Sequence, residues 1–481
     1  VRARMVIEGG NLGVTPRGRV ELSRRGALIN TDFVDNSGGV DCSDHEVNLK
    51  TLLIDEVRSG RITVEQRNEV LIEVQDDVCD QVLTNTREQG LMLGLDEIRS
   101  EVDPFSIERT MMVLEDRGVL DRDAHALPSQ EELTARHAEG LGLFRPELAI
   151  VAAHAKMDAY RRLLKQPVGR VDENRFLFEY FPEVVRTRFP EAIQKHQLRR
   201  EIAMTMLTNR IVDRAGSFFF LDMERETGRS IGHVARSYLI ADDLIRAEEM
   251  RNEILALKSI TARVATHTLV RIQEALRRSA AWLLSSHDDD RLDRIEALIA
   301  DGVSPLKEYE EAIPGCLPGP ELERHENLIS EGIKCGFSPS LAQNMAKFEH
   351  LTAGVRILDI SRTHDILVAD VARVYYLLGH RSGLHPLVRK CDEVVSTGRW
   401  DSLSMRILRN TILDGLWALV TRICGNGSEQ REGDWIEQAV EDLRRKPSYI
   451  AMESDIRRIG SEELSIASVQ VLSVRFRRFV Q

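Results

Sequence analysis

Two short stretches near the start of the chain combine glycine with amide and hydroxyl side chains, residue types that can bind a flat polar ligand. Gly9 and Gly10 follow the apolar run 5–7, and glycines after a strand let the backbone approach a ligand closely. Asn11 then offers hydrogen-bond donors and acceptors, as a nicotinamide carboxamide or a ribose requires. From the residues alone the Gly-Gly-Asn stretch is more typical of a plain turn.

The second stretch is the run Asn36-Ser37-Gly38-Gly39-Val40, which we expect to be a loop leading into a helix. Ser43 and Glu46 have the spacing of a capping box, so the helix should begin at Ser43. Exposed N–H groups and the helix dipole at such a start favour a carboxylate, as in a dicarboxylic amino acid. A plain N-cap explains Ser43 equally well, although one hydroxyl can accept from the backbone and donate to a ligand.

Taken together and in order, these stretches resemble the signatures of glutamate dehydrogenases. Glu8-Gly9-Gly10-Asn11 matches the family's E-G-A-N pattern, and Thr15-Pro16 matches its T-P pattern. Asn36-Ser37-Gly38-Gly39-Val40, with Ser43 and Glu46, matches the pattern N-A-G-G-V-x-x-S-x-x-E. Three segments are also similar in sequence to the bacterial large-subunit, NAD-specific branch of the family, namely residues 29–46, 145–157 and 179–190. Gly10 and Ser37 each stand where the family has alanine, small changes that preserve close approach.

The resemblance implies part of an NAD-dependent glutamate dehydrogenase, which oxidatively deaminates L-glutamate to 2-oxoglutarate and ammonia. It implies cofactor contacts by Gly9, Gly10, Asn11 and Asn36. Val40 would form the wall of the substrate pocket, and the Ser43 hydroxyl would bind the substrate's side-chain carboxylate. Because the family is oligomeric, a homo-oligomer is also implied.

The family's catalytic carboxylate, its substrate lysines and its G-x-G-x-x-G/A pyrophosphate turn have no convincing counterpart in this chain. We expect them upstream, and the start on Val1 inside an expected strand suggests a piece of a longer or processed polypeptide. The chain would then carry no catalytic residue and would supply one wall of the cleft, without turnover of its own.

Two other functions remain open. A related amino-acid dehydrogenase with an apolar substrate is the first, although Ser43 favours a carboxylate-bearing side chain. The second is a helical assembly or regulatory module for which the motif is only the junction to a catalytic domain.

The elements that must position these residues are expected to be mainly helical. We predict a mainly α fold, with a short α/β segment that completes a dinucleotide-binding, Rossmann-like domain, followed by a large all-α region. The expected domains are 1–60, the end of the catalytic domain with a hinge helix, and two parts of a helical C-terminal region, 61–304 and 305–481.

Capping signals place many of the helix starts. Thr63 with Gln66 opens a single long helix over 63–89, and the spacing predicts further helices over 190–225, 231–247 and 249–285. Other starts are expected at Asp103-Pro104, at Ser129-x-x-Glu132 and at Arg145, whose helix should end near Leu164. The proline cluster between Pro305 and Pro320 predicts a loop.

Composition excludes several classes of protein. The net charge of −12 disfavours nucleic-acid binding, and no run approaches the roughly 18 apolar residues that a membrane span needs. Because the start of the chain also lacks a signal-peptide core, we expect a cytoplasmic location. Six scattered cysteines without zinc spacing indicate reduced thiols and no structural metal. The acidic run 287–290 is expected to be a solvated surface, Cys42 a packed thiol and His45 solvent-exposed.

Overall fold

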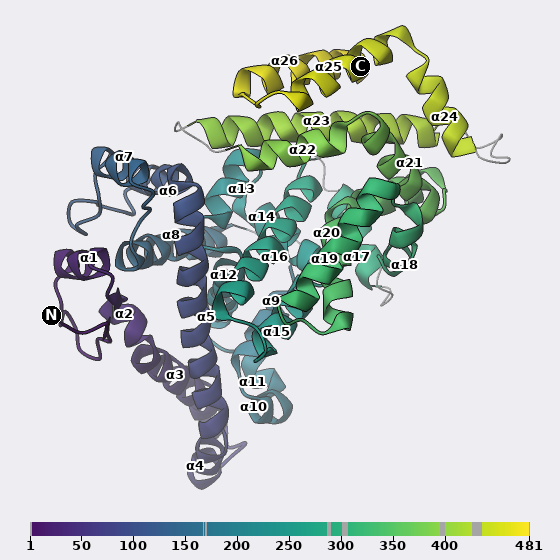
Figure 1. The fold of residues 1–481 in the computed structure, drawn as a ribbon. Helices are drawn as coiled ribbons and strands as arrows, with labels where there is room; N and C mark the ends of the chain where they lie inside the picture. Colours follow the sequence, from purple (N-terminus) through teal and green to yellow (C-terminus); the bar gives the residue numbers. More distant parts are fainter. Residues whose placement is uncertain are drawn as a thin grey trace. The chain divides into compact units, whose positions relative to one another are not determined.

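The computed structural model describes residues 2–166, 168, 171–285, 290–300, 306–394, 400–425 and 435–480. These residues form two short strands and a long succession of helices (Figure 1). They gather into two compact units, each described separately here. Unit 1 comprises Val1–Leu239 and Ala280–His287, and unit 2 comprises Ile240–Ser279 and Asp288–Gln481.

The expected Rossmann-like segment is wrong, whereas the mainly α fold is confirmed. In the described ranges the only sheet pairs β1 (Met5–Val6) in parallel with β2 (Leu28–Ile29), and α1 (Pro16–Arg24) lies between them in sequence. Parallel sheets are normally covered on both faces, but Met5 and Leu28 are 58% and 62% exposed. The short apolar runs therefore make one two-residue ladder, which is no dinucleotide-binding sheet.

Unit 1 contains the strand pair, α1 and a further series of helices. They are α2 (Asp32–Asp35), α3 (Ser37–Arg58), α4 (Val64–Glu73), α5 (Gln75–Val102), α6 (Pro104–Asp116), α7 (Gln130–Ala138), α8 (Arg145–Lys165), α9 (Glu173–Tyr180), α10 (Glu183–Arg188), α11 (Pro190–Gln194), α12 (Arg199–Ala215), α13 (Phe219–Thr227) and the first part of α14 (Ile231–Ile245). The long helix α3 packs along α5 (Figure 1).

Several helix starts follow their capping signals. The Thr63 and Ser129 hydroxyls accept the N–H groups of the residues three positions on, and both capping boxes are complete. Asp103 caps α6 ahead of a proline at the first turn, as predicted. The single helix expected over 63–89 is wrong, because α4 ends at Glu73 and α5 begins at Gln75. The range 190–225 likewise divides into α11, α12 and α13.

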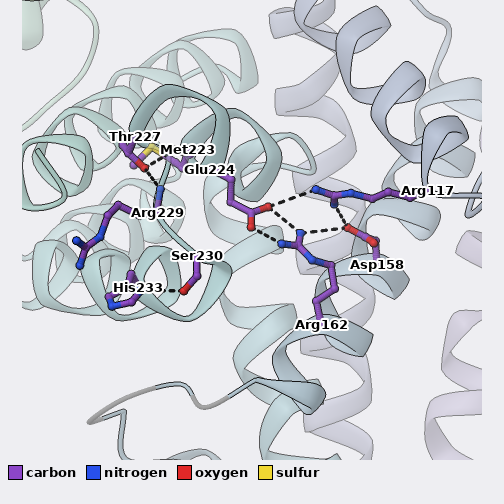
Figure 2. Close-up of polar contacts among 9 residues, drawn as sticks. All are labelled: Arg117, Asp158, Arg162, Met223, Glu224, Thr227, Arg229, Ser230 and His233. Carbon is purple, nitrogen blue, oxygen red and sulfur yellow. Dashed lines mark hydrogen bonds and ion pairs between the residues drawn. The ribbon is translucent and has the colours of Figure 1, made fainter. Parts of the chain in front are cut away.

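The core of unit 1 lies where α5, α6 and α8 meet. Met92 and Leu93 of α5, Met111 of α6 and the buried run 148–152 of α8 belong to one apolar cluster. Around it, a charge network joins three elements: Arg117 after α6, Asp158 and Arg162 of α8, and Glu224 of α13 (Figure 2). This network ties the helices that frame the core to one another.

Unit 2 is helical throughout its described residues. After the end of α14 it holds α15 (Ala247–Ala256), α16 (Ala262–Leu283, up to Ser279), α17 (Asp290–Ala300), α18 (Lys307–Cys316), α19 (Gly319–Lys334), α20 (Pro339–His364), α21 (Val368–Arg381), α22 (Leu384–Glu393), α23 (Asp401–Gly425), α24 (Trp435–Arg444), α25 (Pro447–Ser461) and α26 (Ile466–Val480). None of the described helices is long and apolar enough to span a membrane.

Two of the expectations for this region are wrong. The loop predicted from Pro305 to Pro320 is replaced by α18 and the start of α19, with Pro314 inside α18 and Pro320 in the first turn of α19, where proline is tolerated. The range 249–285 divides into α15 and α16. Residues 301–305, where the expected domain boundary falls, lie outside the described residues.

Candidate functional site

A cleft of about 610 Å³ in unit 1 brings part of the motif against the helical region. Its walls come from the loop before α1, from α2 and α3, and from helices α5, α8, α9 and α12. The lining residues are Asn11, Asp32, Phe33, Asn36, Ser37, Val40, Asp41, Asp44, Asn48, Asn85, Gln89, Tyr160, Tyr180, Leu198, Glu201, Ile202, Thr205, Asn209 and Asp213.

The glycine loop at one end of this cleft is held by a buried ion pair. The Glu8 carboxylate accepts from the Arg19 guanidinium at 2.6 and 2.8 Å and also from the Val14 backbone N–H at 3.0 Å. Arg19 lies in α1, and both side chains are almost fully buried. The hydrogen bonds from Arg19 lower the pKa of Glu8 against the opposing effect of burial. Glu8 therefore acts here as a structural anchor for the loop.

Two aspartates of α2 complete the support of the loop. The Leu12 N–H donates to Asp32 at 2.8 Å, and the Glu8 N–H donates to Asp35 at 2.9 Å. Leu12 has a φ of 55°, the left-handed conformation of a tight turn. Asn11 is thereby fixed at the edge of the cleft. Sequence reasoning missed these aspartates, because charged residues in a short helix give no signal of a distant backbone partner.

The helix that carries the second stretch begins earlier than expected. Asn36 is the N-cap residue of α3, without a side-chain capping bond, so Ser43 lies in the second turn and the predicted capping box is wrong. Glu46 pairs instead with Lys50 on the exposed face. Gly38 suggested a loop, but it faces α5 inside the helix, where an added Cβ would lie 3.4 Å from Val82. That distance is an ordinary van der Waals contact, so Gly38 is compatible with the helix although packing does not require it to be glycine.

Three of the six predicted ligand-binding residues share the cleft, and three do not. Asn11, Asn36 and Val40 line it; Gly9, Gly10 and Ser43 are exposed outside its lining. Nothing lies within 4 Å of a Cβ added at either glycine, so packing within this chain does not require them to be glycine. On α3, Asn36, Val40 and Ser43 follow at steps of four and three residues, which places them along one side of the helix.

The charge of the cleft was not foreseen. Five lining residues are carboxylates, namely Asp32, Asp41, Asp44, Glu201 and Asp213, and none of the lining residues is lysine, arginine or histidine. Asn85 donates to Asp41 at 2.8 Å, and Lys156 pairs with Asp213 at 2.5 Å from outside the lining. Arg19 pairs with Asp32 at 3.1 Å, also from outside the lining, so cations neutralise two of the five carboxylates. The remaining carboxylates make the cleft favour hydrogen-bond donors over phosphates and carboxylates.

One wall of the cleft is a polar cluster that sequence reasoning also missed. The Tyr180 hydroxyl of α9 donates to Asp44 at 2.8 Å and accepts from the Asn48 amide at 2.9 Å. His45, expected in solvent, is buried and stacks on Tyr180 with ring centroids 4.4 Å apart. Burial lowers the pKa of His45. Cys42, expected to be packed, is exposed.

The described residues hold no group of three histidine, cysteine, aspartate or glutamate side chains suited to a metal ion. Within the acidic run 287–290, residues 287–289 lie outside the described residues. We assign no metal site.

Comparison with known proteins agrees with the motif. Residues 1–96 match the family model described as bacterial NAD-glutamate dehydrogenase, catalytic domain, and residues 140–475 match the model described as glutamate dehydrogenase, C-terminal. The two matches lie on either side of α6 and α7, and together they contain every lining residue of the cleft.

Curated relatives named NAD-specific glutamate dehydrogenase are similar over nearly the whole chain. The protein from Halomonas elongata is 32% identical over 90% of this chain, that from Pseudomonas aeruginosa 31% over 98%, and that from Mycobacterium tuberculosis 30% over 99%. The chain corresponds to only 27–29% of the length of these relatives. Since the C-terminal family model alone matches more than half of the 481 residues, the chain belongs to the glutamate dehydrogenase C-terminal family.

Proposed function

We propose that this chain is part of an NAD-dependent glutamate dehydrogenase, which converts L-glutamate to 2-oxoglutarate and ammonia. The observation that carries the proposal is the cleft, where Asn11, Asn36 and Val40 meet although 29 positions separate the first from the last. Both parts of the chain that build the cleft match glutamate dehydrogenase models. The curated relatives named NAD-specific glutamate dehydrogenase add support.

The donors in the cleft fit one end of NAD better than the other. Side-chain amides of Asn11, Asn36, Asn85 and Gln89 offer donors and acceptors suited to a carboxamide and to ribose hydroxyls. The carboxylates of the same wall would repel a pyrophosphate. We infer that this chain holds the nicotinamide end, with Gly9 and Gly10 leaving open space beside it. NAD, when bound, accepts the hydride, and the residues of this chain bind and orient it.

Substrate binding is assigned to two exposed residues of α3, of which Val40 lines the cleft and Ser43 lies outside its lining. We propose that Val40, which is 74% exposed, packs against the aliphatic part of glutamate, and that Ser43 donates to its side-chain carboxylate. Ser43 is not the cap of α3, and its exposed hydroxyl is available to donate to a ligand. The chain would thus form one wall of the site, and no catalytic residue is assigned to it.

The test is Ser43→Ala in the native enzyme that contains this chain. The KM for glutamate should rise far more than the KM for NAD, because the lost hydrogen bond to a charged group contributes about 1.5–3 kcal/mol. Thr51→Ala is the matched control: its hydroxyl is also on α3 and exposed, but it donates to the Val47 carbonyl at 2.8 Å. Equal changes in both KM values would reject the substrate role.

The remaining parts of the proposal concern the whole protein. We propose a cytoplasmic homo-oligomer with domains 1–60, 61–304 and 305–481; the exposed thiols of Cys42, Cys79 and Cys335 support a reducing compartment. The second candidate is an assembly or regulatory module. It is favoured by exposed apolar residues on the last helix, Val471 and Val474, where a further subunit could pack.

A further inference from the structure

The helix that carries Val40 and Ser43 contacts the C-terminal family region through a buried tyrosine and through neighbouring residues. Tyr180 lies at the end of α9, within residues 140–475, and its side chain is buried. Its hydroxyl hydrogen is donated to Asp44, the residue after Ser43, at 2.8 Å. Its oxygen accepts from Asn48, one helical turn further along α3, at 2.9 Å. One hydroxyl therefore binds two consecutive turns of α3.

The same face of α3 has two more contacts with this region. The ring of His45 stacks on Tyr180 with an interplanar angle of 14°. His196, in the connection between α11 and α12, lies 3.2 Å from the Asn48 backbone carbonyl through Nε2, while its Nδ1 accepts from the Leu198 N–H at 3.1 Å. The two bonds select the neutral tautomer with hydrogen on Nε2, and burial lowers the pKa of His196 in the same sense.

These contacts fix the rotation of α3 about its own axis. Consecutive residues of an α-helix point about 100° apart, so a hydrogen bond that holds Asp44 toward Tyr180 also sets the direction of the neighbouring Ser43. Val40 lies one turn before Asp44 and follows the same rotation. Burial raises the pKa of Tyr180 and keeps its hydroxyl protonated as a donor. Packing alone would not need this hydroxyl, because phenylalanine fills nearly the same volume.

We propose that Tyr180 is a positioning residue for substrate binding: through Asp44 and Asn48 it holds α3 in the rotation that presents Val40 and Ser43 to glutamate. The proposal rests on the function proposed above. It gives the C-terminal region a part in substrate recognition in addition to assembly.

Tyr180→Phe in the native enzyme is the first test. It retains the ring stack and removes both hydrogen bonds, so we expect the KM for glutamate to rise by roughly tenfold while kcat changes by less than about twofold. Tyr309→Phe is the matched control, because that buried tyrosine of unit 2 also has two hydrogen bonds, to Tyr376 and to the His350 carbonyl. It should leave the KM for glutamate unchanged.

A double-mutant cycle with Asp44→Ala, which removes the acceptor, separates positioning from general loss of structure. If the two residues act through one hydrogen bond, the double variant Tyr180→Phe/Asp44→Ala should raise the KM for glutamate no more than the worse single variant. Multiplying effects would overturn the proposal.

Hydrogen exchange on the 481-residue chain supplies a readout that needs no activity. Amides of residues 40–50 should exchange faster in Tyr180→Phe and stay unchanged in Tyr309→Phe. A wild-type native enzyme without glutamate-dependent NAD reduction would overturn the proposed function, whereas unchanged exchange over residues 40–50 would overturn the positioning role by itself.

Discussion

Acid should destabilise unit 2, because two of its histidines are buried as neutral imidazoles. His350 of α20 lies between the Tyr376 hydroxyl, 2.8 Å from Nδ1, and His325, 3.3 Å from Nε2. His385 of α22 packs so closely on α21 that a Cβ at Gly379 would lie 2.2 Å from its ring. Burial lowers the pKa of each imidazole from 6.5 to about 3.

Because folding lowers the pKa of both imidazoles, a fall in pH lowers the free energy of unfolding. In the unfolded chain both imidazoles protonate near pH 6.5, whereas in the folded unit they stay neutral down to about pH 3. Their contribution to stability is fully present above pH 6.5 and is lost as the pH falls from 6.5 toward 3. Each imidazole lowers the free energy of unfolding by up to about 1.4 kcal/mol per pH unit. Between pH 6.5 and 4.5 the pair would cost roughly 5 kcal/mol, comparable to the entire stability of many domains.

Urea unfolding of the 481-residue chain between pH 7 and 4.5, followed by tryptophan fluorescence, measures this slope. His350→Gln retains polar groups toward Tyr376 but has no imidazole to protonate, so its free energy of unfolding should depend less on pH, by up to about 1.4 kcal/mol per unit. His267→Gln, an exposed position on α16, is the control and should keep the wild-type slope. A wild-type slope in His350→Gln would refute the reasoning.

Three further predictions follow from the charge network and from the isolated chain. In Arg162→Met, Arg117 remains as the cation of the network that pairs with Glu224 and Asp158. Urea unfolding should show a free energy of unfolding of unit 1 that is lower by about 1–2 kcal/mol. Because the network is partly exposed, an unchanged free energy would mean that solvent screening removes its effect. The purified chain should show a strongly helical circular dichroism spectrum yet fail to reduce NAD with glutamate; measurable turnover would contradict its role as one wall of the site. Light scattering should show self-association of this chain, or loss of assembly when the region after Pro305 is removed from the native enzyme; a monomer together with an unchanged truncated oligomer would reject the assembly role.

Helix starts could be predicted where the signal and its partner lie within one turn. Thr63, Ser129 and Asp103 each cap a helix as expected, because the N–H group that each one binds is three residues away. The same logic failed at Ser43, where an identical Ser-x-x-Glu spacing falls inside α3 and the glutamate pairs with Lys50 instead. A capping pattern therefore cannot by itself be distinguished from a pair of exposed side chains within a helix.

Glycines and prolines predicted loops at positions that are helical in the structure, because tertiary packing decides the conformation there. Glycines 38 and 39 and the prolines between 305 and 320 all indicate breaks, yet the described parts of both ranges are largely helical. Gly38 packs inside α3 beside Val82 of α5, whereas Gly354 of α20 is required to make room for Tyr309, whose ring would lie 2.6 Å from an added Cβ. Such requirements depend on residues more than 40 positions away, which local patterns do not contain.

The residues of the candidate site could likewise be predicted only where they lie close together in the sequence. The half that a resemblance could identify, Asn11 with Asn36 and Val40, is confined to 30 residues of sequence, and the structure does place these three side chains around one cleft. The opposite half comes from α5, α8, α9 and α12, so its negative charge and its tyrosine could not be inferred from the motif. That negative charge disfavours an anionic group inside the cleft, which agrees with the proposal that the glutamate side-chain carboxylate binds Ser43, a residue outside the lining. Asp44, which follows Ser43 in α3, does line the cleft and accepts the hydrogen bond from Tyr180.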